Sequence, residues 1–182
     1  WTPSFFIRTY AWTSLEVSRY YGLVVLVFGP AGILFGGWWA SRWSARGDTI
    51  ANARMVVVCF ALLVIPASGV TLLNDPLNAL ILMALVKFVS GLPLGIAVAA
   101  MHEVTPNRLR ALAVGFYMFT INLIGLGSGP TIVALLTDYL FRDPEMLRYS
   151  MAIVGGATCL IGLLLSLYAL RQFRHQKEIF KL

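Results

Sequence analysis

The sequence predicts an all-α, polytopic transmembrane helix bundle. Of its 182 residues, 59% are hydrophobic and 12% are charged, whereas a soluble domain carries about 25% charged residues. Long uncharged stretches alternate with short polar connections, and the acidic residues all fall at the ends of these stretches or between them. Such a chain has too few polar groups to cover a surface in water, so we expect it to lie in lipid.

Five stretches are long enough to span a bilayer, because a spanning helix needs about 20 apolar residues. Only one of them holds a charged residue in its interior. A partial helix precedes them, since the first ten residues read as the end of a helix already in progress. The expected spans, numbered from this partial helix, are 1–12, 20–41, 55–74, 77–101, 111–137 and 149–170. The chain begins with Trp rather than Met and shows no signal peptide, so residues 1–182 are expected to be a fragment of a longer protein.

Turn signals separate the spans. Asn74-Asp75-Pro76 opens the fourth span, because Pro suits a first helical turn and Asn and Asp favour loops. Thr105-Pro106-Asn107 opens the fifth span, and Arg142-Asp143-Pro144-Glu145 precedes the sixth. The connections are short, so neighbouring helices are expected to be antiparallel.

Basic residues concentrate at one end of the expected bundle. If the spans alternate, nine Lys and Arg residues share the side of the C-terminal tail, and four lie on the opposite side. The nine are Arg42, Arg46, Arg54, Arg108, Arg110, Arg171, Arg174, Lys177 and Lys181; the four are Arg8, Arg19, Arg142 and Arg148. A basic excess marks cytoplasmic loops. We therefore expect a cytoplasmic C-terminus, and the net charge of +6 indicates topology rather than a nucleic-acid partner.

The residue types that catalysis or metal binding needs are poorly placed. No acidic residue lies mid-span, and His102 and His175 are 73 positions apart without a metal-ligand partner at helical spacing. Cys59 and Cys159 fall in apolar runs and are interpreted as small core residues rather than as a disulfide or a metal site. We therefore expect no enzyme activity, no metal site and no cofactor from these residues.

Lys87 departs from this pattern, because it lies near the middle of the fourth span. A charge at that depth costs about 2.5 to 3.5 kcal/mol on insertion scales. One interpretation is that Lys87 faces a water-filled cavity and contacts an anionic group, or pairs with a carboxylate outside this chain. The other is a structural hydrogen bond to the carbonyl groups of a neighbouring helix. Ionisable residues inside a membrane are more often functional, which favours the first interpretation.

Ser90, Gly91, Pro93 and Gly95 follow Lys87 within about two turns. Because Pro removes a backbone donor, we expect a kink here, and a kink beside a buried charge suits a helix that lines a pathway. The alternative is close helix packing through the glycines.

The fifth span carries a G-x-x-x-G pair, Gly125 and Gly129, which lets helix backbones approach closely. Pro130 then bends or loosens the helix. Asn122 lies on the same face and bonds either a ligand or another helix. The second span carries similar glycine and proline residues at Gly29-Pro30-x-Gly32 and Gly36-Gly37. Interruptions of this kind in three helices indicate a bundle that rocks or bends, as transporters do.

Together these residues resemble the C-terminal half of a major facilitator superfamily transporter over essentially the whole chain. The partial helix and the five spans match that family's helices seven to twelve, and the chain is most similar to the Spinster-like group. The stretches that carry the resemblance are Trp1-Thr2-Pro3-Ser4-Phe5-Phe6-x-Arg8, Thr105-Pro106-Asn107-Arg108-Leu109-Arg110, Asn122 to Pro130 and Leu136-Thr137-Asp138.

One family signature is incomplete in this chain. The superfamily's cytoplasmic loop has Gly, three residues, Asp, a basic residue, one residue, Gly and then basic residues. Here Gly37 is followed by Ser41 at the Asp position, Arg42 at the basic position, Ser44 for the Gly and Arg46 at the end. Without the Asp, the arginines are interpreted chiefly as positive-inside residues with a modest gating role.

The resemblance implies that the first, second, fourth and fifth helices border a central cavity and that the third and sixth are peripheral. It implies a secondary active transporter that works by alternating access, coupled to protons, for a small organic anion or an amphipathic, lipid-like substrate. Lys87 would contact the substrate, with Asn122, Tyr117 and Ser90 as further cavity residues. The expected partners are this substrate, membrane lipids and a missing N-terminal half, in a bacterial inner membrane. The rival expectation is a non-transporting receptor or scaffold built on the same fold.

Overall fold

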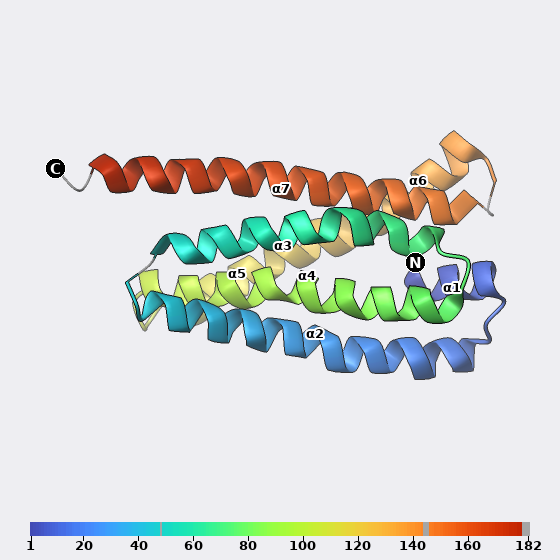
Figure 1. Cartoon of the computed structure of the whole chain (residues 1–182), viewed down its shortest axis with the longest axis horizontal. Helices are drawn as coiled ribbons and strands as arrows, with labels where there is room; N and C mark the ends of the chain where they lie inside the picture. Colours follow the sequence, from blue (N-terminus) through green and yellow to red (C-terminus); the bar gives the residue numbers. More distant parts are fainter. Residues whose placement is uncertain (48, 144–145, 180–182) are drawn as a thin grey trace.

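The computed structural model describes residues 1–47, 49–143 and 146–179, and its regular elements within these ranges are all helices. They are α1 (Thr2–Tyr10), α2 (Ser14–Ser44), α3 (Thr49–Gly69), the 3₁₀ turn η1 (Val70–Leu72), α4 (Pro76–Val104), α5 (Arg110–Ile121), the π-helical segment η2 (Asn122–Leu126), α6 (Gly127–Leu135), the π-helical segment η3 (Leu136–Phe141) and α7 (Leu147–Ile179). Figure 1 shows the long helices aligned along one axis, with α1 packed at the end where α2 begins. The fold is an all-α membrane bundle, as the sequence predicts.

Five of the described helical stretches are long and apolar enough to cross a membrane. They run over Ser14–Ser44, Ile50–Leu72, Pro76–Ala99, Arg110–Tyr139 and Leu147–Gln172. These stretches match the five complete spans expected from the sequence. The second helix begins six residues before the expected Tyr20 and the last continues past Leu170, because helices extend through the polar boundary beyond the apolar core of a span.

Local capping explains two of these boundaries. Thr13 and Glu16 form a capping box at the start of α2, in which the Thr13 hydroxyl accepts from Glu16 N at 3.3 Å and the Glu16 carboxylate accepts from Thr13 N at 2.8 Å. At the start of α4, the Asp75 carboxylate accepts from Leu77 N and Asn78 N, both at 3.3 Å, and Pro76 occupies the first turn. The turn expected at Asn74-Asp75-Pro76 is confirmed.

Glycines hold α2 and α4 together, backbone against backbone. A Cβ added to Gly91 would lie 3.0 Å from both Gly29 O and Ile33 N, and a Cβ on Gly32 or Gly95 would overlap main-chain atoms of the opposite helix. The two helices run in the same direction (Figure 1). Small residues at a crossing allow this close approach, and in lipid such van der Waals packing is a principal source of helix association. We call Gly32, Gly36, Gly91 and Gly95 the glycine clamp.

The third and last helices pack in a similar way on the other side. Gly155 of α7 lies against the Ala67 carbonyl, where an added Cβ would come within 2.9 Å, and Gly162 lies against the ring of Phe60. Cys59 is fully buried in a cluster with Leu63, Val89 and Leu92, and Cys159 packs beside it. Both cysteines are free thiols. The interpretation as a small core residue is confirmed for Cys59, and Cys159 is partly buried beside it.

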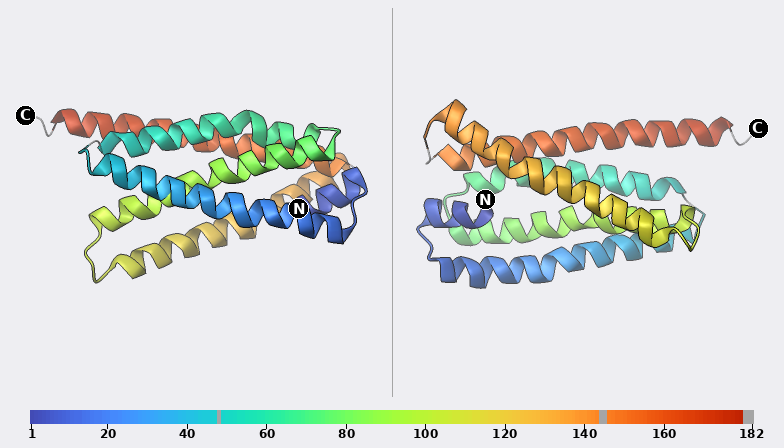
Figure 2. Two further views of the ribbon diagram at one scale, coloured as in Figure 1. Left: turned by 60° about the horizontal axis from the view of Figure 1, so that its bottom comes forward. Right: turned by 180° about the vertical axis from the view of Figure 1, so that it is seen from behind.

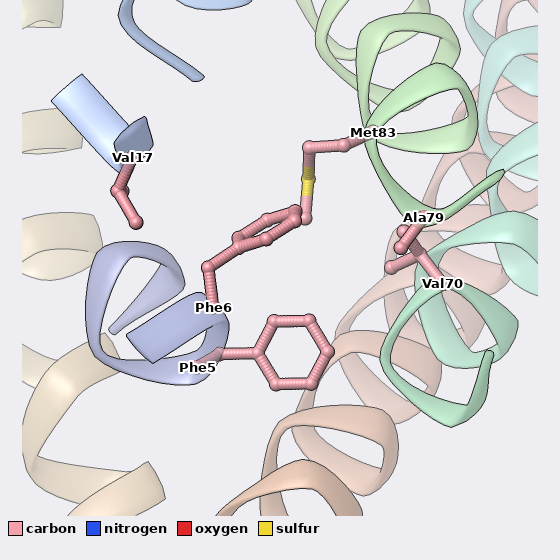
Figure 3. Packing of buried hydrophobic residues seen from close by; sticks show 6 residues of the cluster. All are labelled: Phe5, Phe6, Val17, Val70, Ala79 and Met83. Carbon is pink, nitrogen blue, oxygen red and sulfur yellow. The ribbon is translucent and has the colours of Figure 1, made fainter. Parts of the chain in front are cut away.

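The short helix α1 is anchored by two phenylalanines. Phe5 and Phe6 are both fully buried, with ring centroids 5.4 Å apart in an edge-to-face arrangement. Figure 3 shows the Phe6 ring reaching toward Met83 of α4, with Val17 of α2, Val70 of η1 and Ala79 of α4 around the pair. Tyr10 adds a hydrogen bond from its hydroxyl to the Leu73 carbonyl at 2.7 Å. Residues of α2, η1 and α4, together with the Leu73 carbonyl, thus fix the position of α1.

The span Arg110–Tyr139, which is the fifth when counted from α1, is the least enclosed by other helices. Within its most apolar stretch 6% of the residues are buried inside the bundle, against 39% for α4. Figure 2 shows it running obliquely to α2 and α7 in both views. Side-chain hydrogen bonds between described residues connect it to other parts of the bundle: Trp1 Nε1 donates to Pro130 O at 3.0 Å, and the Thr137 and Ser150 hydroxyls lie 2.9 Å apart.

Candidate substrate-binding helices

Lys87 lies in the twelfth position of the 29-residue helix α4. It stands one turn after Met83, which contacts the Phe6 cluster, and one turn before Gly91 of the glycine clamp. Residues four apart share a face of a helix, so Lys87 lies between the anchored end of α1 and the crossing with α2. Its side chain is partly buried, and among the described residues its ammonium group has neither a carboxylate partner nor a hydrogen bond.

The residues after Lys87 have two roles: Ser90 forms a hydrogen bond to the helix backbone, and the glycines pack against α2. Ser90 is exposed and its hydroxyl donates to the Lys87 carbonyl at 3.0 Å. Gly91 and Gly95 pack against α2, and α4 continues as one helix through Pro93. The sequence predicts a kink at Pro93, and α4 remains one continuous helix there. The glycines provide the close packing that was the alternative.

Asn122 marks the point where the fifth span changes from α- to π-helix. Its side-chain amide donates to Met118 O at 2.7 Å, and the residue is exposed. The π-helical segment ends four residues before Pro130, which has no N–H to offer the Leu126 carbonyl. Single π turns inside helices recur at functional sites. The Asn122 side chain thus supports its own backbone in this structure and bridges to no other described helix.

The G-x-x-x-G pair of this span faces open space. A Cβ added to Gly125 or Gly129 would meet nothing within 4 Å. No described helix therefore packs against the pair, in contrast to Gly91 and Gly95. Close packing at Gly125 and Gly129 stays a prediction that needs a helix beyond those described.

Tyr117 is partly buried one turn before Ile121, and its hydroxyl makes no hydrogen bond within the described ranges. No hydrogen bond joins Lys87 or Ser90 of α4 to Tyr117 or Asn122 of the fifth span among the residues described. The predicted cavity residues thus come from two different spans, α4 and the span Arg110–Tyr139.

Arg42 and Arg46 lie at the end of α2 and stack on tryptophans. The guanidinium carbon of Arg42 lies 5.6 Å from the Trp38 ring centroid, and that of Arg46 lies 4.9 Å from the Trp43 ring. Both arginines are exposed. Ser41, at the position of the missing Asp, donates to the Gly37 carbonyl of its own helix at 2.9 Å. Aromatic and basic side chains in this combination suit a membrane–water boundary.

Two hollows accompany these helices. One lies between α2 and α4, has a volume of about 520 Å³ and is entirely apolar; its lining is Val24, Phe28, Leu80, Ile81, Ala84, Leu85 and Phe88. The other has a volume of about 530 Å³ and lies where α2 and α4 end and α5 begins; its lining is Ser41, Ser44, Ala45, Ala99, His102 and Arg110. The sequence did not predict the second hollow, because its polar residues come from three helices separated by long apolar runs. The only signal was the basic excess at this end, which was interpreted as topology.

No group of three or more His, Cys, Asp or Glu side chains that could hold a metal ion occurs in the part of the chain that the structure describes. Apolar spanning helices, one of which carries a lysine at mid-span, indicate an integral membrane protein.

The chain is similar to an "MFS-type efflux pump" of Mycolicibacterium smegmatis (strain ATCC 700084 / mc(2)155), with 26% identity over 183 aligned positions that cover 99% of this chain. The chain spans 42% of the length of that relative. This similarity supports membership of the major facilitator superfamily, and it supports membrane transport rather than catalysis. No family model matches the chain. No solved structure matches it either.

Proposed function

We propose that this chain is the C-terminal six-helix half of a proton-coupled secondary transporter of the Spinster-like group, which moves a small organic anion or an amphipathic, lipid-like molecule by alternating access. The observation that carries the proposal is the similarity to an efflux pump over 99% of the chain. By analogy with that relative, the direction of transport is export. The proposed setting is a bacterial inner membrane with the C-terminus in the cytoplasm, where the basic excess would face.

The helix packing supports different roles for different helices of this half. The glycine clamp joins α2 and α4 rigidly, and α3 and α7 pack on each other through Gly155 and Gly162. The fifth span carries two π-helical segments and open glycines. In alternating access, one bundle rocks against the other about a central site. The clamped helices would then move as one body, and the fifth span would bend.

Lys87 is the residue proposed to contact the substrate. Its ammonium group lies at mid-span and has no counter-charge among the residues described, so an anionic group would recover part of the cost of burying it. Asn122, Tyr117 and Ser90 would contribute weaker polar contacts. The carboxylates that carry protons are proposed to lie outside these 182 residues, because no acidic residue of this chain lies mid-span.

The test is transport by the complete protein in proteoliposomes with an imposed pH gradient. A panel of organic anions and lipid-like amphiphiles should include at least one substrate whose flux depends on the gradient. Lys87→Met should lower that flux by about tenfold or more, as expected for the loss of one charged contact worth about 1.5 to 3 kcal/mol. Leu85→Met, at an exposed position of the same helix, is the matched control and should transport normally.

Two outcomes would overturn parts of the proposal. Unchanged flux and affinity in a normally inserted Lys87→Met protein would make Lys87 a structural residue. An absence of flux for every member of the panel would favour a receptor or scaffold on this fold.

A further inference from the structure

The indole of Trp1 connects the short helix α1 to the fifth span. Trp1 Nε1 donates to the Pro130 carbonyl at 3.0 Å, and this bond joins residues that are 129 positions apart in the chain. Trp1 is also the N-cap residue of α1, where its own carbonyl accepts from Phe5 N at 2.8 Å. A single residue thus belongs to the first turn of α1 and bonds to the backbone of another span.

The packing of α1 holds Trp1 in place. Phe6 follows Trp1 by five residues and is fully buried. Its ring reaches toward Met83 of α4 (Figure 3), and Met83 lies one turn before Lys87 on the same helix. A run of packed side chains that ends in one hydrogen bond therefore leads from the helix that carries Lys87 to the backbone of the fifth span.

Pro130 lies where the backbone of the fifth span is weakest. It has no N–H to bond to the Leu126 carbonyl, and the π-helical segment Asn122–Leu126 ends at that residue. Helices kink at prolines and at π-helical turns. The bond from Trp1 falls immediately after this gap, within α6, so it restrains one side of the place where the span can bend.

The two sides of the gap differ in their hydrogen bonds to the rest of the bundle. After the gap, Trp1 donates to Pro130 O, and the Thr137 and Ser150 hydroxyls lie 2.9 Å apart. Before the gap, no described side chain of α5 forms a hydrogen bond to α1, α2, α3 or α7. α6 is therefore the part of the span that other helices hold, and α5 is the part that is left to move.

We propose that Trp1 is a positioning residue for the fifth span. Its indole N–H holds the Pro130 carbonyl, so that the span bends at Asn122–Leu126 and α5 moves while α6 stays with α1. The proposal rests on the transport role proposed above, in which this span bends during alternating access. A side chain from another helix is needed to fix the bend, because only 6% of the apolar stretch of this span is buried.

The first measurement is amide hydrogen exchange in the complete protein in detergent, without substrate. Local opening determines the exchange rate, so the loss of a hydrogen bond that restrains a segment raises it. Trp1→Phe removes the indole N–H and keeps an aromatic ring. We expect exchange in α6 to rise about threefold, which corresponds to an average hydrogen bond between spanning helices, and exchange in α5 to stay unchanged.

Two further variants separate the hydrogen bond from the volume of the indole. Trp12→Phe is the matched control at the other end of α1, where the indole packs on Phe6 at 5.1 Å between ring centroids and forms no hydrogen bond with the described residues. It should leave exchange in α6 as in wild type. Trp1→benzothienylalanine replaces the N–H by sulfur in a ring of nearly the same size, and it should raise exchange as Trp1→Phe does. It keeps the test decisive if Trp1→Phe fails to fold.

The second measurement is flux in proteoliposomes. Trp1→Phe should lower the turnover several-fold with an unchanged KM, because the substrate contacts remain and the bend is no longer held in place. In a Pro130→Ala background, where the gap in the backbone ladder is closed, Trp1→Phe should have little further effect on turnover.

Wild-type exchange in α6 when the N–H is replaced by sulfur, or an equal rise in Trp12→Phe, would overturn the proposal. Wild-type turnover in a Trp1→Phe protein whose exchange has risen would also overturn it, because holding α6 would then not matter for transport. The exchange readout needs no substrate. Raised exchange in the Trp1 variants of a protein that transports nothing would retain Trp1 as the residue that holds the span while the proposed transport function fails.

Discussion

Two glycine pairs with the same four-residue spacing behave in opposite ways in this molecule. Gly91 and Gly95 of α4 lie directly against the backbone of α2, whereas Gly125 and Gly129 of the fifth span meet nothing. The surroundings differ accordingly, since 39% of the apolar stretch of α4 is buried and 6% of that of the fifth span. The same spacing thus forms a helix–helix contact in α4 and leaves an open surface in the fifth span. Spacing alone therefore does not identify a packing interface.

The largest effect should come from filling the glycine clamp. Gly95→Leu would push a side chain into the Ile33 carbonyl and Gly37 N of α2, and backbone atoms cannot move aside as the end of a flexible side chain can. Overpacking of a tight core costs about 1 to 3 kcal/mol and more where the backbone must shift. We expect little folded protein after solubilisation, measured by size-exclusion chromatography and thermal unfolding.

The matched variant is Gly129→Leu, which has the same spacing and the same added volume in open space. It should leave the yield and the unfolding midpoint of the protein close to wild type. If Gly129→Leu were as damaging as Gly95→Leu, a helix beyond those described would pack on the fifth span, and the contrast between the two pairs would disappear in the complete protein.

The sequence predicted where the spans lie, but it did not predict which helices pack against each other. Charged residues and turn signals located all five complete spans, because a spanning helix must be long and apolar, with few interior charges. Whether Gly91 or Gly125 forms a close contact depends on which helix lies opposite, and that information is not local. The sequence therefore left packing and kinking as alternatives at Gly91 and Pro93, and the structure shows packing there.

Only part of the candidate site could be predicted from the sequence. Lys87 stood out because a charge at mid-span is costly, and its position in the middle of α4 agrees with the sequence interpretation. The hollow lined by Ser41, His102 and Arg110 was missed, because residues 69 positions apart (110 minus 41) meet there through the arrangement of three helix ends. The capping role of Asp75 was predictable, since it depends on neighbouring residues alone.

An intermediate effect is expected from restoring a regular helix in the fifth span. Pro130→Ala returns an N–H that can bond to the Leu126 carbonyl, at the end of the π-helical segment Asn122–Leu126. If this segment is the place where the span bends during transport, the variant should transport several-fold more slowly with unchanged or slightly higher thermal stability. Flux in proteoliposomes and the unfolding midpoint are the two measurements.

Pro66→Ala is the control for this variant, because Pro66 lies inside α3, which packs closely on α7. It should change flux less than Pro130→Ala does. Equal slowing by both variants would indicate a general effect of proline on helix insertion, and the fifth span would lose its distinction as the flexible element.

The smallest effect should come from the hydrogen bond that joins the C-terminal end of the fifth span to α7. Thr137 is 5% exposed and Ser150 is fully buried, and their hydroxyls lie 2.9 Å apart. Hydrogen bonds between spanning helices contribute about 0.6 kcal/mol on average and at most about 1.7 kcal/mol. A double-mutant cycle of Thr137→Val and Ser150→Ala should therefore give a coupling free energy of unfolding of about 0.6 kcal/mol.

Thr131→Val is the control, because the Thr131 hydroxyl donates to Gly127 O of its own helix at 3.1 Å. It should show no coupling to Ser150→Ala. A coupling free energy of zero for the Thr137 pair would mean that α7 does not hold this span through the two hydroxyls, and that the fifth span is even less constrained than its contacts indicate.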